Sequence, residues 1–287
     1  MGLTEDRVAV VTGASRGAGK GIALALGEAG TTVYVTGRTR STSDSGLPGT
    51  VFETAQEIDK RGGTGIPVIC DHSRDEQVAA LFEQVEREHG ALDVLVNNAF
   101  TIPSDLPKKG PFWEKSLALQ DMFDVGMRSA YVASYYAARL LIKNSAGLVV
   151  NTSSFGGRCY MHGPAYGAGK AAVDKMAHDM AVDLKPYNVA VISLWMGLLK
   201  TERTKALFEG APDRYKSFAA GAESPEFTGR LIDALARDPK LMERSGQVLI
   251  GAELGEELGV LDVDGTRPHS HRETLGAPPT FNKAIIQ

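Results

Sequence analysis

The chain has 287 residues, a formal net charge of −4, 43% hydrophobic residues and 23% charged residues. This composition is typical of a folded globular protein and excludes wholesale disorder, which needs few apolar residues and a high net charge. The acidic balance disfavours nucleic acid and anionic membranes as partners. The longest dense apolar run, residues 189–199, has eleven residues, too few for a membrane span of ~18 residues.

The N-terminal sequence and the cysteine content indicate where the protein resides. The sequence MGLTEDR is acidic and lacks the apolar stretch of a signal peptide. Two cysteines, Cys70 and Cys159, make no disulfide framework. Both features predict a reduced, cytoplasmic protein. Glycine is unusually frequent, with 32 residues, which indicates tight turns or close approaches of the backbone.

Short runs rich in Val, Ile and Leu alternate along the chain with segments of helical periodicity. Strands are expected at 7–12, 32–36, 66–70, 92–96, 148–152, 189–194 and 248–251. Helices are expected at 17–30, 52–62, 75–89, 119–143, 165–185, 201–208 and 224–237. Continuous apolar strands that alternate with helices are typical of a parallel sheet covered on both faces. The pattern predicts an α/β protein with a Rossmann-type, doubly wound, seven-stranded parallel sheet and helices on both faces.

A glycine-rich turn, Thr-Gly-Ala-Ser-Arg-Gly-Ala-Gly at 12–19, joins the first strand to the first helix. Small residues let the backbone approach a pyrophosphate, and the helix N-terminus supplies N–H donors and positive potential. The residues expected to line this anion site are Gly13, Ser15, Arg16, Gly17, Ala18 and Gly19. An ordinary strand-to-helix turn is the alternative, because glycine motifs also match by chance.

Arg38 follows the second strand, 19 residues after Gly19. In dinucleotide-binding folds an acidic residue near this position binds the ribose 2′-hydroxyl, whereas an Arg suits the 2′-phosphate of NADP. Arg16 offers a second guanidinium for the same phosphate. These residues predict a preference for NADP(H), with NAD(H) as the alternative cofactor. A solvated pair of surface arginines is the structural alternative.

Tyr166 and Lys170 are four residues apart on an expected helix, so that their side chains lie on one face. A free tyrosine has a pKa of about 10, and a nearby cation and a helix N-terminus both lower it. Tyr166 is therefore a candidate general acid and base, with a serine hydroxyl from the end of the fifth strand to position a carbonyl oxygen. An exposed tyrosine beside a solvated lysine is the alternative.

Together and in this order, these motifs resemble the short-chain dehydrogenase/reductase family over residues 4–260. Further matches are Asp71 after the third strand, the Asn-Asn-Ala sequence at 97–99 and the Ser-Gly-Gln-Val sequence at 245–248. We therefore expect residues 1–263 to form a single NAD(P)-binding catalytic domain. Residues 264–287, which are polar and rich in Pro, His and Thr, are expected to be a C-terminal extension.

The resemblance implies a role for several residues. Asp71 matches the residue that holds the adenine amino group, and Asn97 the residue that braces the cofactor loop. Tyr166 matches the catalytic acid, and Lys170 the residue that binds the nicotinamide ribose and lowers the pKa of that tyrosine. The expected cofactor site also includes His72, Asn98 and Ala99.

Two serines are candidates for the catalytic hydroxyl. Ser153 stands thirteen residues before Tyr166, which is the common spacing in the family. Ser154 matches better by its surroundings, Asn-Thr-Ser-Ser-x-Gly-Gly, with a loop one residue shorter. We expect Ser154 to be the catalytic serine.

Three positions depart from the family pattern. Phe100 replaces the last Gly of Asn-Asn-Ala-Gly, and Met196 replaces the Pro of Pro-Gly after the sixth strand. Many members carry a catalytic Asn in the long central helix, where Gly126 stands here, 28 residues before Ser154. That Asn supports a water in a proton relay past the Lys, so its absence concerns the relay and not the fold. Residues 39–49 resemble an insertion near the adenosine end.

The resemblance implies hydride transfer between NADPH and a hydrophobic ketone or aldehyde, or a secondary alcohol. Apolar residues that suit such a substrate are expected around the nicotinamide, although core packing is the alternative for each: Phe100, Trp113, Phe155, Tyr160, Met161 and Met196. The expected assembly is a homodimer or homotetramer. The competing hypothesis is a catalytically degenerate dinucleotide-binding sensor or interaction protein, which the three departures favour and the intact Ser-Tyr-Lys set opposes.

Four histidines and four aspartates are assigned to the solvated surface. The histidines show no metal-binding spacing and are expected at the surface, namely His72, His162, His269 and His271. The aspartates on the expected helices are assigned solvation only, namely Asp121, Asp174, Asp179 and Asp183.

Overall fold

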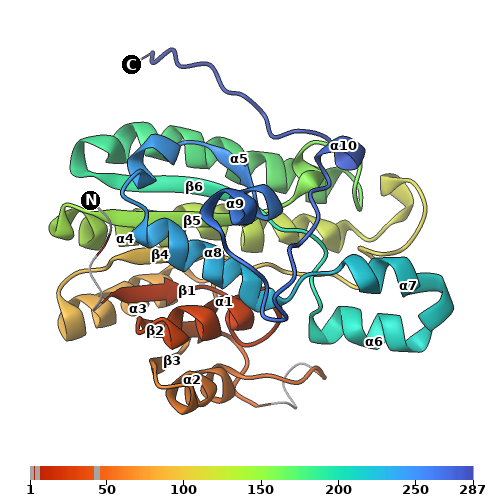
Figure 1. Ribbon diagram of the computed structural model, residues 1–287, viewed down its shortest axis with the longest axis horizontal. Coiled ribbons are helices and arrows are strands. Elements are labelled where there is room, and N and C mark those ends of the chain that lie inside the picture. The colour runs from red at the N-terminus through yellow and green to blue at the C-terminus, as the bar shows by residue number, and fades with distance from the viewer. Residues whose placement is uncertain (1–2, 4–6, 42–45, 287) are drawn as a thin grey trace.

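A computed structural model describes residues 3, 7–41 and 46–286. Within these residues the chain forms seven strands, which are β1 (Val8–Val11), β2 (Thr32–Gly37), β3 (Thr64–Ile69), β4 (Val94–Asn97), β5 (Gly147–Ser153), β6 (Val189–Trp195) and β7 (Val248–Ile250). They pair in parallel in the order β3-β2-β1-β4-β5-β6-β7 (Figure 1). The chain moves outward from β1 to β3, returns beside β1 as β4 and continues to the other edge. This is the doubly wound order, so the predicted fold is confirmed.

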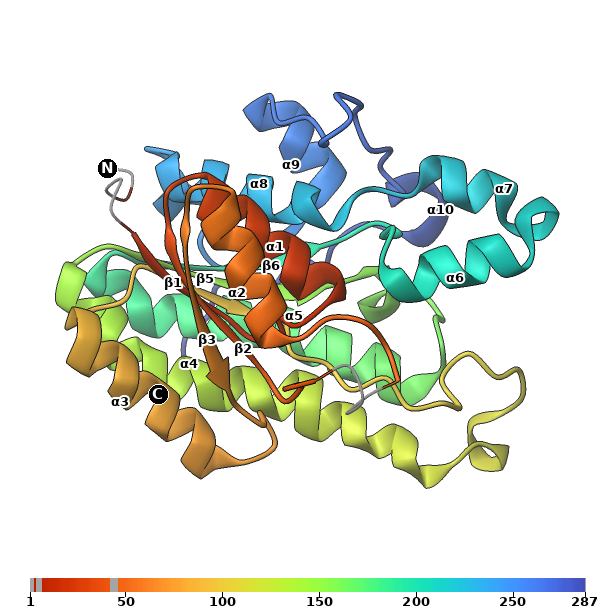
Figure 2. The ribbon, with the colours of Figure 1, turned by 90° about the horizontal axis from the view of Figure 1, so that it is seen from below.

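The helices are α1 (Gly17–Glu28), α2 (Val51–Lys60), α3 (Asp75–His89), α4 (Ser129–Leu141), α5 (Pro164–Leu184), α6 (Glu202–Gly210), α7 (Pro212–Gly221), α8 (Pro225–Arg237), α9 (Gly251–Leu258) and α10 (Arg272–Leu275). One face of the sheet carries α1, α2 and α8, and the other carries α3, α4 and α5 (Figure 2). α7, α9 and α10 were not expected from the sequence. Beyond α10 the chain continues as an extended tail (Figure 1).

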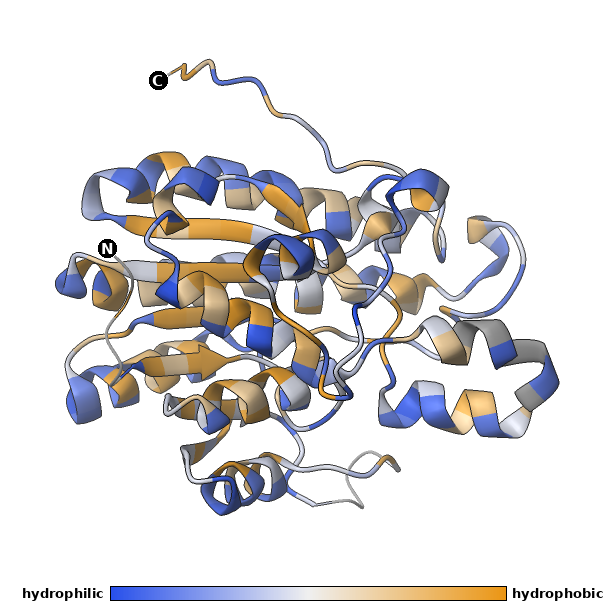
Figure 3. Cartoon of the chain, in the orientation of Figure 1, coloured by the Kyte–Doolittle hydropathy of each residue, from blue (hydrophilic) through white to orange (hydrophobic). Residues whose placement is uncertain are grey.

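Two apolar layers hold the helices on the sheet. Because successive side chains of a strand point to opposite faces, Ala9 and Val11 of β1 pack with α1, α2 and α8, whereas Val10 packs with α3, α4 and α5. The strands are therefore mostly apolar, while the outer helices alternate apolar and polar faces (Figure 3). Burial on both faces explains why the strands were readable as continuous apolar runs.

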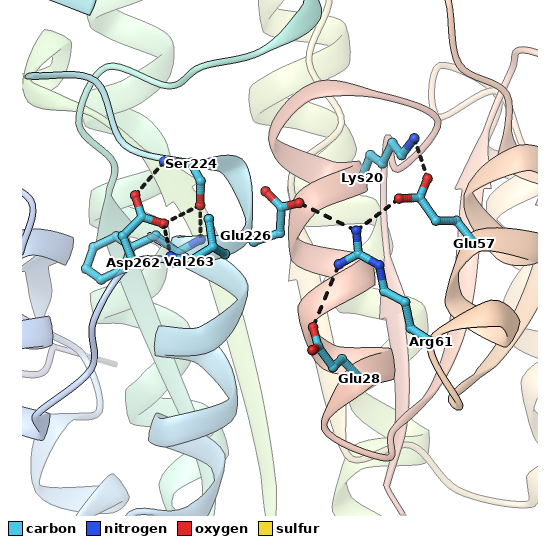
Figure 4. Close-up of polar contacts among 9 residues, drawn as sticks. Lys20, Glu28, Glu57, Arg61, Ser224, Glu226, Asp262 and Val263 are labelled. Carbon is cyan, nitrogen blue, oxygen red and sulfur yellow. Dashed lines mark hydrogen bonds and ion pairs between the residues drawn. The ribbon is translucent and has the colours of Figure 1, made fainter. Parts of the chain in front are cut away.

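Ion pairs join α1, α2 and α8 to one another on this face of the sheet (Figure 4). Arg61, at the end of α2, lies 3.0 Å from Glu57, 3.7 Å from Glu28 of α1 and 3.9 Å from Glu226 of α8. Lys20 of α1 lies 2.7 Å from the same Glu57. Exposed ion pairs are individually weak, but these contacts connect three helices through one arginine.

The start of α8 is fixed by a serine cap. Ser224 Oγ accepts a hydrogen bond from Phe227 N at 3.2 Å, and Asp262 Oδ2 accepts one from Ser224 N at 2.8 Å (Figure 4). Ser224 Oγ also donates to the Asp262 carboxylate. The segment after α9 is therefore attached to the loop that leads into α8.

The single helix expected at 119–143 is wrong, because the chain breaks within it. A wide turn covers Phe123–Arg128, and regular helix begins only at Ser129. At the break Val125 is extended, and Gly126 has φ +151. This backbone region favours glycine, and a Cβ on residue 126 would also meet the Phe100 ring at 2.7 Å. The apolar periodicity on both sides of the break concealed it.

Candidate active site

The glycine turn lies at the carboxyl end of β1, where the strand order reverses between β1 and β4. Thr12 Oγ1 accepts hydrogen bonds from Asn98 N at 2.8 Å and Ala99 N at 2.9 Å. Asn98 Nδ2 donates to the carbonyls of Thr12 and Gly13 at 2.9 and 3.2 Å. A Cβ on Gly13 would lie 2.7 Å from Ala99 Cα, and one on Gly19 would lie 2.3 Å from Gly13 O. The turn is therefore packed against the end of β4 so closely that side chains are excluded.

The N-terminus of α1 already binds an anionic oxygen. Gly17 N donates to Glu202 Oε2, from the first residue of α6, at 2.9 Å. The first turn of α1 carries no acidic residue of its own, so its N–H groups and positive potential are directed toward a group from outside the helix. The Glu202 carboxylate thus lies at the N-terminus of α1, a place where helices favour anions.

The two arginines predicted to bind a 2′-phosphate differ in their surroundings. The Arg16 guanidinium donates to the carbonyls of Pro48 and Gly49 at 2.9 and 2.7 Å and so holds that loop beside the glycine turn. Arg38 is exposed at the carboxyl end of β2, and its charge acts on Asp71. Of the insertion expected at 39–49, residues 42–45 lie outside the described residues.

Asp71 and His72 follow β3 and have different environments. Asp71 Oδ1 accepts hydrogen bonds from Ser73 N and Oγ at 3.0 and 2.8 Å. Although burial acts to raise it, these bonds and the Arg38 charge hold the pKa of Asp71 below its ordinary value. His72 is buried, and its Nε2 lies 2.8 Å from Thr36 Oγ1. The expected surface position of His72 is therefore wrong, and burial lowers its pKa to about 4.

Hydrogen bonds from Asn97 link β4 to β5 and to α4. Its Nδ2 donates to Ser134 Oγ on α4 and to Asn151 Oδ1 on β5, both at 2.9 Å. Asn151 Nδ2 donates in turn to Val173 O on α5 at 3.0 Å. This buried chain of amides positions the end of β4 against β5 and α5.

Ser154, Tyr166 and Lys170 converge where β5 ends and α5 begins. Ser154 Oγ lies 2.9 Å from Tyr166 Oη. Lys170 Nζ donates to Thr152 O at 3.1 Å and lies 5.8 Å from the centroid of the Tyr166 ring. Ser153 is fully buried, and its hydroxyl points to Lys170 O at 3.4 Å. Of the two serines, Ser154 is therefore the one in contact with Tyr166.

Burial dominates the electrostatics of this group. It lowers the pKa of Lys170 to about 8, against the opposing effect of the Asp174 carboxylate. It also raises the pKa of Tyr166, and the hydrogen bond from Ser154 offsets only part of this. The lowering of the Tyr166 pKa expected from Lys170 does not outweigh this burial, since the ammonium donates to the Thr152 carbonyl.

Asp174 is a buried member of this group, so the prediction that it is only solvated is wrong. It lies one turn after Lys170 on α5 and is 0% exposed. Its Oδ1 accepts hydrogen bonds from Ser193 Oγ at 2.6 Å and Trp195 Nε1 at 3.1 Å, which join α5 to β6. Burial raises its pKa despite these bonds. Asp174 lies four residues after Lys170, and this spacing, which places both on one face of the helix, could have indicated the contact from the sequence. The other three aspartates assigned to solvent are exposed, namely Asp121, Asp179 and Asp183.

Sequence reasoning also missed Glu223, a buried carboxyl behind the loop that follows β6. Its Oε1 accepts a hydrogen bond from Gly197 N at 3.1 Å. Its backbone N–H donates to Leu198 O and its carbonyl accepts from Lys200 N, both at 2.8 Å. Burial raises the pKa of Glu223 to about 7, and the nearby Asp262 charge adds to this. No motif marks such a residue, because its partners come from a different segment.

The apolar residues expected around a substrate lie in different environments. Phe155 is buried against Trp195 and belongs to the core. Trp113 and Tyr160 are 71% and 81% exposed. Phe100 reaches the polar group itself, since its ring lies edge-on to Tyr166 with centroids 5.8 Å apart.

The fold and this site define the class of the protein. Residues 7–212 match the family described as short chain dehydrogenase, and the chain belongs to the short-chain dehydrogenase/reductase family of oxidoreductases. Members of this family bind NAD(P)(H). Among the described residues, no helix combines the length and apolar character that crossing a membrane requires.

Particular relatives cover nearly the whole chain. It is 43% identical over 283 residues to dehydrogenase/reductase SDR family member 1 of Mus musculus, covering 95% of this chain and 88% of that protein. It is 42% identical over 270 residues to the Homo sapiens protein of the same name, covering 90% and 84%. A solved short-chain type dehydrogenase/reductase from Mycobacterium marinum superimposes with a TM-score of 0.70 at 28% identity, covering 85% of this chain and 93% of that one.

Proposed function

We propose that the protein is an NADPH-dependent oxidoreductase that acts on a hydrophobic ketone or aldehyde, or on a secondary alcohol, through Ser154, Tyr166 and Lys170. The observation that carries this proposal is the 2.9 Å contact of Ser154 Oγ with Tyr166 Oη, beside the buried Lys170 ammonium. Two hydroxyls that converge on one point bind a carbonyl oxygen, and one of them can deliver a proton to it.

The residues present fit a dinucleotide. The cradle of Gly13 and Gly19 admits no Cβ, and Gly17 N already binds a carboxylate oxygen, so a phosphate suits the same donors. Arg38 is exposed at the end of β2, where a guanidinium favours a 2′-phosphate over a bare ribose. When bound, the nicotinamide would supply or accept the hydride.

The chain's own residues would handle the proton and the charge. Tyr166 Oη would donate its proton to the substrate oxygen during reduction and take it back during oxidation. Because burial raises the pKa of Tyr166, the tyrosine stays protonated until its proton is transferred to the substrate oxygen. Ser154 would donate a hydrogen bond to the same oxygen, and the Lys170 ammonium would stabilise the tyrosinate that remains.

A second candidate function is a dinucleotide-binding sensor that has lost its chemistry. Three positions favour it, because Phe100, Met196 and Gly126 depart from the family pattern, and Gly126 stands where many members carry a catalytic Asn. The two functions differ in turnover and share cofactor binding.

Titration calorimetry with NADPH and with NADH, followed by a panel of hydrophobic carbonyl compounds, tests the proposal. We expect tighter binding of NADPH and oxidation of NADPH by some members of the panel. Tyr166→Phe should retain NADPH affinity and lose at least about 100-fold in turnover. Turnover near wild type in that variant would contradict the mechanism. Binding without turnover for the whole panel would favour the sensor.

We also propose a homodimer or homotetramer that pairs α4 and α5 of neighbouring subunits. Tyr131 and Tyr135, one turn apart on α4, are 55% and 54% exposed, which is unusual for two large rings on one helix face. Light scattering on the purified protein should give a mass of two or four chains. A monomer at micromolar concentration would contradict this.

A further inference from the structure

Lys170 has few polar partners for a buried ammonium. Among the described residues, Nζ donates one hydrogen bond, to Thr152 O at 3.1 Å. The centroid of the Phe100 ring lies 4.8 Å from Nζ, closer than the Tyr166 ring at 5.8 Å. The charge of Asp174 acts on the ammonium from the next turn of α5. An aromatic face at this distance attracts a cation, and more strongly where water is excluded.

The space that holds the Phe100 ring is made by the break in the central helix. A Cβ on residue 126 would lie 2.7 and 2.9 Å from two carbons of that ring. Gly126 has φ +151, and the turn is held by Thr101 N donating to Val125 O at 3.0 Å. The segment after β4 and the break before α4 therefore fit each other around one ring.

We propose that Phe100 is a positioning residue for Lys170: its ring face holds the ammonium beside Tyr166, and Gly126 leaves the room that the ring requires. The contact stands on geometry alone, whereas its effect on turnover rests on the proposed function. The groups that face the ammonium are Asp174 and Tyr166 from α5, the Thr152 carbonyl from β5 and the neutral Phe100 ring. Asp174 and the ring favour the charged lysine, and burial opposes it.

Carbon-13 NMR of lysine-labelled protein measures this contact without any turnover. The Lys170 signal is assigned from its loss in Lys170→Met. In Phe100→Leu, which keeps an apolar side chain without a ring, we expect the midpoint of the Lys170 titration to fall by about half a pH unit or more. Phe100→Tyr keeps the ring face and should restore the midpoint. Phe52→Leu, at an exposed position of α2, is the matched control and should change nothing.

A substitution at residue 126 tests the contact of Phe100 with Lys170 without changing Phe100 itself. Gly126→Ala should displace the ring and lower the Lys170 midpoint in the same direction, so the proposal can be tested even if Phe100→Leu folds poorly. It should also lower Tm, and this loss should be smaller in a Phe100→Ala background, because only the backbone cost then remains. Additive losses in Tm, or a midpoint unchanged in Phe100→Leu, would overturn the proposal.

The pH profile of kcat/KM connects the contact to the reaction. In Phe100→Leu, the pH at which kcat/KM falls on the alkaline side should decrease by the same amount as the NMR midpoint of Lys170. An NMR shift in a protein without turnover would support the Phe100 contact and contradict the proposed function. If Phe100→Leu turns over substrate and the alkaline fall of kcat/KM stays at the wild-type pH, Phe100 has no role in the reaction.

Discussion

Ser154 Oγ lies 2.9 Å from Tyr166 Oη, whereas the hydroxyl of the adjacent Ser153 faces the backbone of α5. Ser153 ends β5 and Ser154 continues in extended backbone, in which neighbouring side chains point to opposite sides. Only one of these two serines can therefore reach a substrate in front of Tyr166.

This difference predicts unequal effects of two equivalent substitutions. Ser154→Ala should reduce kcat/KM by about 10- to 1000-fold, because a donor to the reacting oxygen is lost. Ser153→Ala should leave kcat/KM within about threefold and lower Tm, because it removes a buried hydrogen bond. Steady-state kinetics with thermal melts of both variants check this. Equal losses of activity would contradict the assignment of Ser154.

Arg38 should decide between the two cofactors. Arg38→Asp should weaken NADPH by about 10-fold or more while leaving NADH within about threefold, since the carboxylate repels a 2′-phosphate and accepts a bond from a 2′-hydroxyl. Lys240→Asp makes the same change of charge at an exposed position after α8 and is the matched control. Calorimetry with both dinucleotides measures the effect, and equal losses for both would rule out contact with the phosphate.

Glu202 should compete with a dinucleotide for the α1 terminus. Its Oε2 holds Gly17 N at 2.9 Å, and a phosphate needs the same donor. Glu202→Gln removes the charge and should tighten NADPH and NADH alike by about 2- to 10-fold. Glu209→Gln, exposed on the same helix, should have no effect. Weaker binding in Glu202→Gln would mean that the carboxylate assists the cofactor instead of competing with it.

Glu223 should make the protein less stable as pH rises. Its pKa is about 7 in the folded state against an ordinary 4.5, so the unfolded chain releases this proton first. Protonated Glu223 therefore contributes on the order of 3 kcal/mol to the free energy of unfolding. This contribution is complete below about pH 4.5 and is lost as pH rises to about 7. Urea unfolding at about pH 5 and about pH 8 measures it. Glu223→Gln should remove this part of the dependence, and an unchanged difference between the two pH values would contradict it.

The sheet and the paired Tyr166 and Lys170 could be predicted because their signals are local. Strand ends differ from expectation by at most two residues, since most strands are buried on both faces. Asp174 and His72 were misplaced because their burial depends on Trp195 and Thr36, which come from other strands. The break at Gly126 depends on a ring 26 residues earlier. Periodicity within one segment carries no information on such contacts.

The two tryptophans of the chain give it a pair of built-in optical reporters. Trp195 is 0% exposed with its indole N–H bonded to Asp174, while Trp113 is 71% exposed. Emission from Trp195 should lie to the blue and resist iodide quenching, and emission from Trp113 should lie to the red and be quenched readily. Changes around the buried Asp174 and around the exposed segment of Trp113 can therefore be followed separately in the unlabelled wild-type protein, through the two ends of one fluorescence spectrum.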